Sequence, residues 1–210
     1  MERRSVNLMN FLDFKSKYCK ETPNMIFLPP KIQGWNSESV ALKKAIEQTN
    51  PESIVEVGSW LGASALFLAA QSNAQIICVD TFLGSNEILW REENVKNVTQ
   101  NFSQIYDQFC ANITHSNLNN IISPLPMTSS SAAELFAKEQ VKVDMVYIDA
   151  GHREREVYAD LQDWWPLTNK VLVGDDYDST WSGVISAANR FASENNLNLE
   201  IMDSKFLLFR

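Results

Sequence analysis

Short apolar segments that alternate with segments of helical spacing constrain the fold of this chain more than any other feature. Segments such as SIVEVG, QIICVD and KVLVGDD are apolar along most of their length, which is typical of strands covered on both faces. The segments between them, such as GASALFLAAQS, carry apolar residues at helical spacing. This alternation predicts an α/β fold, with a Rossmann-like, doubly wound, mostly parallel sheet and helices on both faces.

The positions of the expected elements follow from the same pattern. Strands are expected at residues 53–58, 75–80, 121–126, 143–150 and 170–176, and an antiparallel C-terminal hairpin within 197–210 makes the sheet seven-stranded. Helices are expected at 36–50, 62–72, 130–140, 154–167 and 181–195. Asn36 or Ser37 is expected to cap the first of these helices, and a serine is expected to cap the third. The chain before Pro30 is expected to be irregular or weakly helical.

Length and charge limit the classes of function. The 210 residues suit a single domain, 1–210, with an N-terminal arm at 1–35 and an insertion at 84–120. A net charge of −8 argues against a nucleic-acid partner and against docking on an anionic membrane, because both are bound mainly through Lys and Arg. No apolar run approaches the roughly 20 residues of a membrane span. The absence of a signal-peptide pattern and the scattered cysteines favour a cytoplasmic protein with reduced thiols.

Acidic residues directly follow two of the expected strands. Asp149 comes after MVYI, and Asp175 and Asp176 come after VLVG. The carboxyl ends of parallel strands meet at one edge of the sheet, where ligands bind, so these acids are expected at that edge. Buried, unpaired carboxylates are unfavourable. The three acids therefore either face solvent or surround a positive group.

The turn after the first strand, VEVGSWLGASA, has features of a cofactor-binding turn. Gly58 can adopt backbone angles closed to other residues, and Gly62 lets the helix N-terminus approach a ligand. Trp60 replaces the second glycine of a dinucleotide-binding turn, and Glu56 would repel phosphates, so a nicotinamide oxidoreductase is disfavoured. An acid at Glu56 suits an amine-bearing ligand. Asp80, at the end of the second strand, is placed to accept both hydroxyls of a ribose.

The order E-x-G-x-x-x-G-x-S, followed by an acid that ends the second strand, resembles the class I S-adenosylmethionine-dependent methyltransferases. The resemblance implies that Gly58, Gly62 and Ser64 line the methionine end of the cofactor. It also implies that Glu56 lies near the methionine amine or holds the turn, and that Asp80 binds the ribose. The remaining cofactor-binding residues that it implies are Ser59, Trp60, Thr128, Ser129 and Asp149. The segment MTSSS departs from the Asp-containing pattern common at the adenine side.

The longer signature IDAGHREREVYADL…GDDY is similar to the metal-dependent sugar O-methyltransferases of the macrocin O-methyltransferase type. The acids also resemble the metal site of the catechol O-methyltransferases, with Asp-Asp in place of Asp-Asn. The resemblance covers roughly residues 50–185 and implies a metal site of Asp149, Asp175 and Asp176. A divalent cation would relieve the repulsion among three carboxylates, and oxygen ligands favour Mg²⁺ over zinc, which prefers His or Cys.

These features predict an S-adenosylmethionine-dependent and Mg²⁺-dependent O-methyltransferase acting on a hydroxyl of a small molecule, with a sugar or glycosylated metabolite as the acceptor. His152, in the D-x-x-H arrangement, is expected to be the catalytic base. The alternatives are a catechol or phenolic O-methyltransferase and a non-catalytic S-adenosylmethionine-binding protein. Trp35 is a candidate lid residue. The insertion 84–120 is expected to bind the acceptor or a second subunit, and a homodimer is compatible with the sequence.

Overall fold

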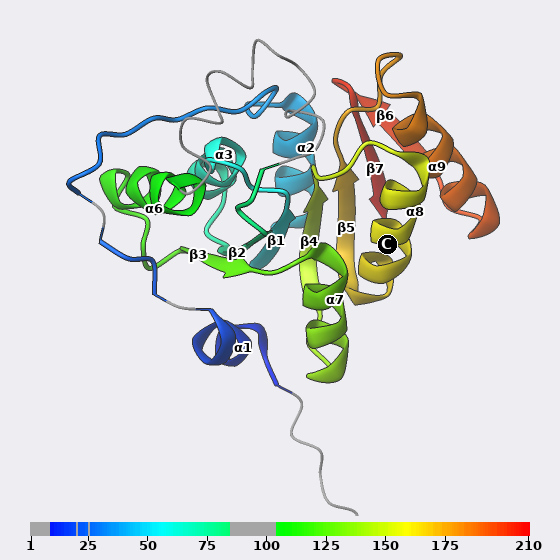
Figure 1. Cartoon of the computed structure of the whole chain (residues 1–210). Helices are drawn as coiled ribbons and strands as arrows, with labels where there is room; N and C mark the ends of the chain where they lie inside the picture. The colour runs from blue at the N-terminus through cyan, green and yellow to red at the C-terminus, as the bar shows by residue number, and fades with distance from the viewer. Residues whose placement is uncertain (1–8, 20, 25, 85–103) are drawn as a thin grey trace, which may run out of the picture.

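A seven-stranded sheet forms the centre of the computed structural model, which describes residues 9–19, 21–24, 26–84 and 104–210. The strand order is β3-β2-β1-β4-β5-β7-β6 (Figure 1). Strands β1 to β5 pair in parallel, and β7 pairs antiparallel with both β5 and β6. The strands are β1 (Ser53–Val57), β2 (Gln75–Asp80), β3 (Ile122–Pro126), β4 (Val143–Ile148), β5 (Thr168–Gly174), β6 (Leu199–Met202) and β7 (Lys205–Phe209). This arrangement confirms the predicted fold class.

Helices cover both faces of the sheet (Figure 1). One face packs against α2 (Val40–Thr49), α3 (Ala63–Gln71) and α6 (Ile105–His115), and the other packs against α7 (Ser129–Lys138), α8 (Glu154–Trp164) and α9 (Ser182–Glu194). Each face of the sheet has its own hydrophobic core, and successive strand residues point into opposite cores. Val55 faces α7 and α8, while its neighbour Ile54 faces α2 and α3. Strands β1 to β5 are therefore apolar along most of their length, because both of their faces are covered.

The N-caps of two helices differ from those expected. Ser39 caps α2, and its hydroxyl accepts the N–H of Ala41, whereas Asn36 donates its side-chain amide to the carbonyl oxygen of Asp203. The prediction of Asn36 or Ser37 as the cap was therefore wrong, because α2 begins later and Asn36 serves a long-range contact. Thr128, not a serine, caps α7.

The N-terminal segment contains a helix, α1 (Phe11–Tyr18), where a weakly helical or irregular chain was expected. Phe14 packs on Phe136 of α7 with ring centroids 4.0 Å apart. The buried ammonium of Lys15 donates to the side chain of Gln75 and to the carbonyl oxygen of Ile121, each at 2.6 Å. These contacts hold α1 against the β2–β3 edge of the sheet.

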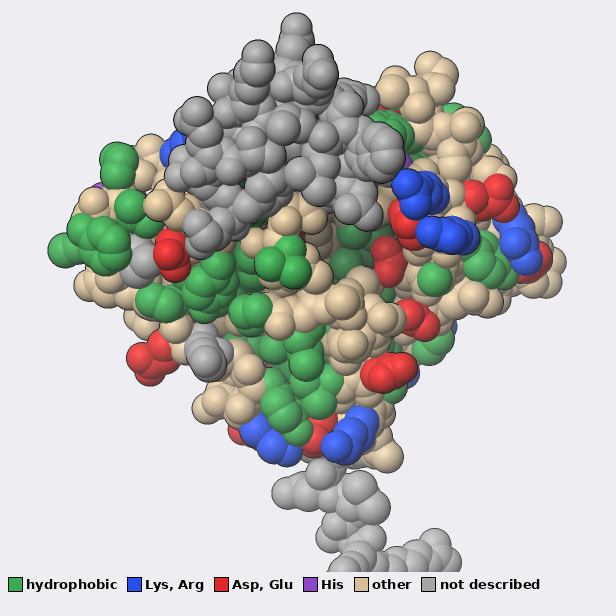
Figure 2. Space-filling model, in the orientation of Figure 1, with side chains coloured by type: hydrophobic (Ala, Val, Ile, Leu, Met, Phe, Trp, Pro, Cys, Tyr) green, Lys and Arg blue, Asp and Glu red, His purple; other side chains and the backbone are tan. Residues whose placement is uncertain are grey.

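Two further segments complete the described part of the chain. A short 3₁₀ helix, η2 (Trp165–Leu167), follows α8 at the proline that was expected to end it. Of the predicted insertion, residues 85–103 lie outside the described residues, and α6 occupies most of the remainder. Lys and Arg side chains are intermixed with acids over α8 and α9 (Figure 2), and Arg190 pairs there with Glu194. No described helix has the length and hydropathy needed to cross a bilayer.

Candidate cofactor and cation site

The site lies where the carboxyl ends of β1 and β4 meet, at the point where the strand order reverses. The backbone N–H of Asp149 donates to Val57 at 2.8 Å, and the N–H of Asp175 donates to Ile148 at 2.9 Å. Residues 58–62, here called the cofactor turn, therefore lie beside Asp149, Asp175 and Asp176, here called the acidic cluster. This is the edge at which open α/β sheets bind ligands.

Backbone geometry explains both glycines of the cofactor turn. Gly58 has a φ of +91°, and a Cβ atom there would lie 1.9 Å from the carbonyl oxygen of Asp149. Gly62 has a φ of +87°, and its Cβ would lie 3.1 Å from the ring of Phe109. Gly58 thus permits the close approach of the turn to β4. Gly62 supplies a left-handed residue at the N-terminus of α3 and contacts α6, a packing role beyond the ligand approach that the sequence suggested.

Buried polar groups without partners gather around this turn. Among the described residues, Glu56 Oε1, Ser59 Oγ and Trp60 Nε1 are buried and accept or donate no hydrogen bond within the protein. Burial raises the pKa of the Glu56 carboxyl, and the nearby hydroxyl of Ser64 opposes that rise. Buried polar groups are almost always satisfied in native proteins. These unsatisfied atoms therefore mark a place for a polar ligand.

Asp80 ends β2 and is hydrogen-bonded to the same turn. Its two carboxylate oxygens accept the backbone N–H groups of Trp60 at 2.8 Å and of Phe82 at 2.7 Å. Burial raises the pKa of Asp80, and these backbone hydrogen bonds oppose the rise. Each oxygen retains a second lone pair, so the carboxylate can still accept hydroxyl groups of a ligand.

The loop after β3 lies beside Asp80, because the N–H of Met127 donates to the Asp80 carbonyl oxygen at 3.1 Å. The side chains of the next two residues already have partners. Thr128 caps α7, and the Ser129 hydroxyl donates to Asp160 of α8 and accepts the indole N–H of Trp164. The Ser129 side chain therefore braces α7 against α8, and this role was not anticipated.

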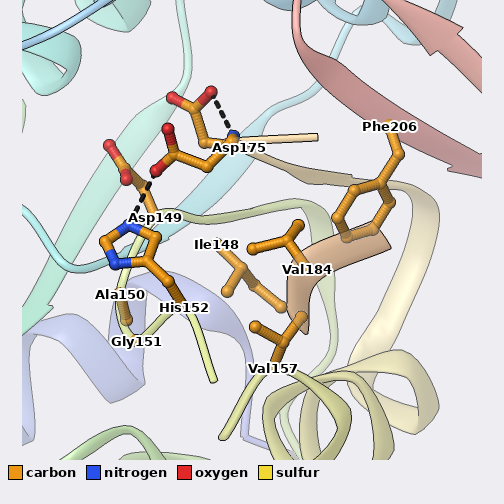
Figure 3. A pocket seen from close by; sticks show the side chains of 10 residues that line it. Ile148, Asp149, Ala150, Gly151, His152, Val157, Asp175, Val184 and Phe206 are labelled. Atoms are coloured by element: carbon orange, nitrogen blue, oxygen red, sulfur yellow. Dashed lines mark hydrogen bonds and ion pairs between the residues drawn. The ribbon is translucent and has the colours of Figure 1, made fainter. Parts of the chain in front are cut away.

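The carboxylates of Asp149 and Asp176 converge with the imidazole of His152. One ligand atom from each of the three residues lies within 4.8 Å of the others. His152 Nε2 is 2.7 Å from Asp176 Oδ2, and its ring stacks on Trp181 with centroids 4.0 Å apart. Figure 3 shows Asp149 and His152 on one side of a small pocket, which Asp176 also lines, and the other side is apolar, lined by Ile148, Val157, Val184 and Phe206.

Asp175, the third acid, has a different environment. Its carboxylate is paired with Lys205, whose Nζ lies 2.7 Å from both carboxylate oxygens, and it also accepts the Tyr147 hydroxyl at 2.5 Å. Neither Lys205 nor Tyr147 was predicted from the sequence as a partner of Asp175. The signal for Lys205 was its place at the start of the apolar run Phe206–Leu208, because every residue from Lys205 to Leu208 is buried.

The charges of the acidic cluster affect each other. Burial raises the pKa of Asp149 well above its usual range, and the nearby charges of Asp175 and Asp176 raise it further. Burial also raises the pKa of Asp175, against the lowering effect of Lys205. Two carboxylates and an imidazole that converge on one point, with an adjacent acid, form a donor set that fits a divalent cation.

Aromatic side chains flank both halves of the site. Trp35 of the N-terminal arm is 57% exposed, and its ring centroid lies 6.3 Å from that of Trp60. Tyr177 follows the acidic cluster directly, and its hydroxyl accepts the side-chain amide of Asn189. Trp164 and Trp165 are buried and pack in the core.

Comparison with known proteins identifies the family. A family model described as a methyltransferase domain matches residues 55–177 of the chain. A comparison with curated protein sequences found no match.

Three solved structures with the same fold are distant from this chain in sequence. An O-methyltransferase from Bacillus cereus in complex with SAH is 14% identical, with a TM-score of 0.59 over 87% of this chain and 84% of that one. The O-methyltransferase TomG from Streptomyces achromogenes in complex with SAM is 13% identical, with a TM-score of 0.57 over 94% and 93%. CalS11, a TDP-rhamnose 3'-O-methyltransferase, is 16% identical, with a TM-score of 0.52 over 80% and 76%.

The family match begins in β1 and ends just after the acidic cluster, so it contains both the cofactor turn and the three acids. The fold, with its C-terminal antiparallel hairpin, agrees with these neighbours. The chain therefore belongs to the methyltransferase-domain family and is an S-adenosylmethionine-dependent methyltransferase with the class I fold.

Proposed function

We propose that this methyltransferase is a cation-dependent O-methyltransferase that acts on a hydroxyl group of a small molecule. The position of Asp149 carries the proposal. Its backbone contacts the cofactor turn, while its side chain belongs to the group of ligand atoms formed with His152 and Asp176. A methyl donor bound at the turn would thus lie next to groups that can bind and deprotonate a hydroxyl.

The roles proposed around the cofactor follow from the polar groups at the turn. Glu56, Ser59, Trp60 and Ser64 surround the methionine part, and Gly58 and Gly62 give it space. The buried carboxylate of Glu56 would pair with the methionine amine, which supplies the missing partner of Oε1. Asp80 would accept the ribose hydroxyls, and the backbone of the loop at Thr128 and Ser129 would border the adenine.

The cation is proposed to be held within the acidic cluster of Asp149, Asp175 and Asp176, and oxygen ligands favour Mg²⁺. When bound, such a cation lowers the pKa of a coordinated hydroxyl and orients its oxygen. The mutual repulsion of the acids supports this proposal, because it adds to burial in raising the pKa of Asp149, and the nearby charge of Lys205 only partly opposes that rise.

His152 is proposed as the base. Its Nε2 bonds to Asp176 and its ring stacks on Trp181, so the imidazole is held at the mouth of the site. The acceptor oxygen attacks the methyl carbon of the sulfonium, the carbon–sulfur bond breaks, and neutral S-adenosylhomocysteine leaves. The hydroxyl proton passes to His152.

A sugar hydroxyl is the proposed acceptor. The D-x-x-H arrangement of Asp149 and His152 supports this proposal, and one structural neighbour is described as a TDP-rhamnose 3'-O-methyltransferase. A vicinal diol would suit a site in which the cation and the base must reach neighbouring oxygens.

The proposal is tested by measuring S-adenosylhomocysteine release with a panel of nucleotide sugars, glycosides and catechols, with Mg²⁺ or with EDTA. We expect turnover of a sugar that EDTA abolishes, and a loss of about 100-fold or more in His152→Asn and Asp149→Asn. Glu154→Gln is the control, because Glu154 is an exposed acid close to His152 in the chain. Turnover that persists in EDTA, or that survives Asp149→Asn, would refute cation-dependent transfer. Turnover of catechols alone would assign the phenolic class instead.

A further inference from the structure

Lys205 is a buried cation inside the acidic cluster. It begins β7, directly after the turn at Asp203 and Ser204, and its side chain has no exposed surface. Its Nζ lies 2.7 Å from each carboxylate oxygen of Asp175 and 3.1 Å from the carbonyl oxygen of Asn36. Removing an ammonium group from water is unfavourable unless it is paired and hydrogen-bonded, and Asp175 provides that pairing.

The carboxylate of Asp175 has no accepting position left. Its Oδ1 receives Lys205 and the backbone N–H of Asp176 at 2.7 Å. Its Oδ2 receives Lys205 and the Tyr147 hydroxyl at 2.5 Å. A carboxylate offers about four lone-pair positions, and these four contacts use them.

The other two acids differ in this respect. The described contacts of the Asp149 side chain include one long hydrogen bond, from the Tyr147 hydroxyl at 3.4 Å. Asp176 contacts His152 through Oδ2. Both side chains are partly exposed and belong to the convergent set, whereas Asp175 does not. Only two of the three acids therefore present free oxygen positions to the pocket.

Asp175 also fixes the backbone that carries Asp176. Asp176 has a φ of +59°, a left-handed conformation that is uncommon for residues other than glycine. The Asp175 carboxylate accepts the N–H of this same residue. Lys205 pairs with both oxygens of the same carboxylate, so the ion pair keeps Asp176 turned toward Asp149 and His152.

We propose that Lys205 withdraws Asp175 from cation binding, so that Asp149 and Asp176 are the carboxylate ligands and Asp175 is a positioning residue. This inference rests on the proposed function and refines its cation site. A site with two carboxylates leaves more coordination positions for water and acceptor oxygens, which is how proteins usually hold Mg²⁺. Lys205 also ties the cation site to Asn36, the residue that directly follows the N-terminal arm.

The test is titration with Mn²⁺, a paramagnetic probe for a Mg²⁺ site, monitored by electron paramagnetic resonance of the free ion. The double variant Asp175→Asn/Lys205→Met removes the ion pair without leaving a buried charge, and Asn can still accept the N–H of Asp176. We expect its Mn²⁺ affinity to fall by about tenfold, at the low end of the range for outer-shell changes, because Asn keeps the contact with the N–H of Asp176. Asp149→Asn and Asp176→Asn should lose more than about 100-fold, the upper end of that range, because they remove direct ligands.

The single variant Lys205→Met gives a change in the opposite direction. It frees the Asp175 carboxylate beside the site, so Mn²⁺ should bind more tightly than to the wild type, which loss of a merely structural contact would not produce. If the double variant loses Mn²⁺ as completely as Asp149→Asn, Asp175 is a ligand and the inference is wrong. If the wild type binds S-adenosylmethionine but no Mn²⁺, the cation-dependent function fails together with the inference.

Discussion

At the scale of single residues, Gly58 determines how closely the cofactor turn approaches the acidic cluster. The nearest atom to a Cβ at Gly58 would be the backbone carbonyl oxygen of Asp149, which cannot move aside without displacing β4. The φ of +91° adds strain for any side chain. We expect Gly58→Ala to lower the free energy of unfolding by more than about 2 kcal/mol, measured by urea denaturation.

Gly151→Ala provides the matched control for this prediction. Gly151 lies in the same site, and its Cβ would first meet the carboxylate of Glu156, the far end of a flexible side chain. Gly151→Ala should therefore be milder than Gly58→Ala. Equal denaturation midpoints for Gly58→Ala and the wild type would show that the turn can move away from β4, contrary to this account.

At the scale of elements, Asp160, at the contact of α7 with α8, should make the free energy of unfolding depend on pH. It accepts the Ser129 hydroxyl, and burial raises its pKa to about 6, above the ordinary value of 3.8. The folded state therefore holds this proton more tightly than the unfolded chain does. The contribution of Asp160 to stability is most favourable below the unfolded pKa and is lost as the pH rises through about 6.

Asp160→Asn tests this pH dependence, since Asn keeps an acceptor for Ser129 and carries no charge. Its gain in unfolding free energy over the wild type should be near zero at pH 4 and rise to about 2–3 kcal/mol above pH 7. Urea denaturation across this pH range measures the difference. Asp163→Asn, on the exposed side of the same helix, should give a smaller change. A gain from Asp160→Asn that stays constant with pH would contradict the assignment.

The C-terminal hairpin also completes the N-terminus of α2. Asp203 Oδ2 accepts the Ser39 hydroxyl at 2.7 Å and the N–H of Val40 at 3.2 Å. A carboxylate at this end of a helix is favourable both as an acceptor and as a charge near the positive end of the helix dipole. The last two strands therefore support an element near the start of the chain.

Asp203→Asn separates charge from hydrogen bonding at this contact. Asn tolerates the left-handed φ of +53° found at this position, and its amide oxygen can still accept both hydrogen bonds. We expect it to lower the unfolding free energy by about 0.3–1 kcal/mol at low ionic strength, and less in 1 M NaCl. Asp203→Ala should lower it further. A loss from Asp203→Asn that does not change with salt would show that the charge has no part in it.

At the scale of the whole molecule, local patterns determined what could be predicted. Apolar strands, helical spacing and the glycine turn are short-range signals, and parallel pairing then brings Glu56, Asp80 and Asp149 to one edge of the sheet. The Lys205–Asp175 pair joins residues 30 positions apart, and the contact of Asp203 with Ser39 spans 164. Both depend on the register of β7 beside β5, which apolar periodicity alone does not specify.

The cofactor should stabilise the entire domain, because it satisfies buried groups that the protein leaves unpaired at the centre of the sheet edge. At a concentration 100 times its Kd, S-adenosylmethionine should add about 2.7 kcal/mol to the unfolding free energy. For a domain of this size, that corresponds to a rise of about 5–10 °C in Tm, measured by calorimetry.

Glu56→Gln should weaken cofactor binding without lowering the stability of the ligand-free protein. It removes a buried charge, so the ligand-free protein should be at least as stable as the wild type, while the cofactor Kd should rise about tenfold or more. Glu52→Gln, an exposed acid just before β1, should leave both values unchanged. If Glu56→Gln shows the full rise in Tm at the wild-type cofactor concentration, Glu56 does not bind the methionine amine and its burial serves only to hold the turn.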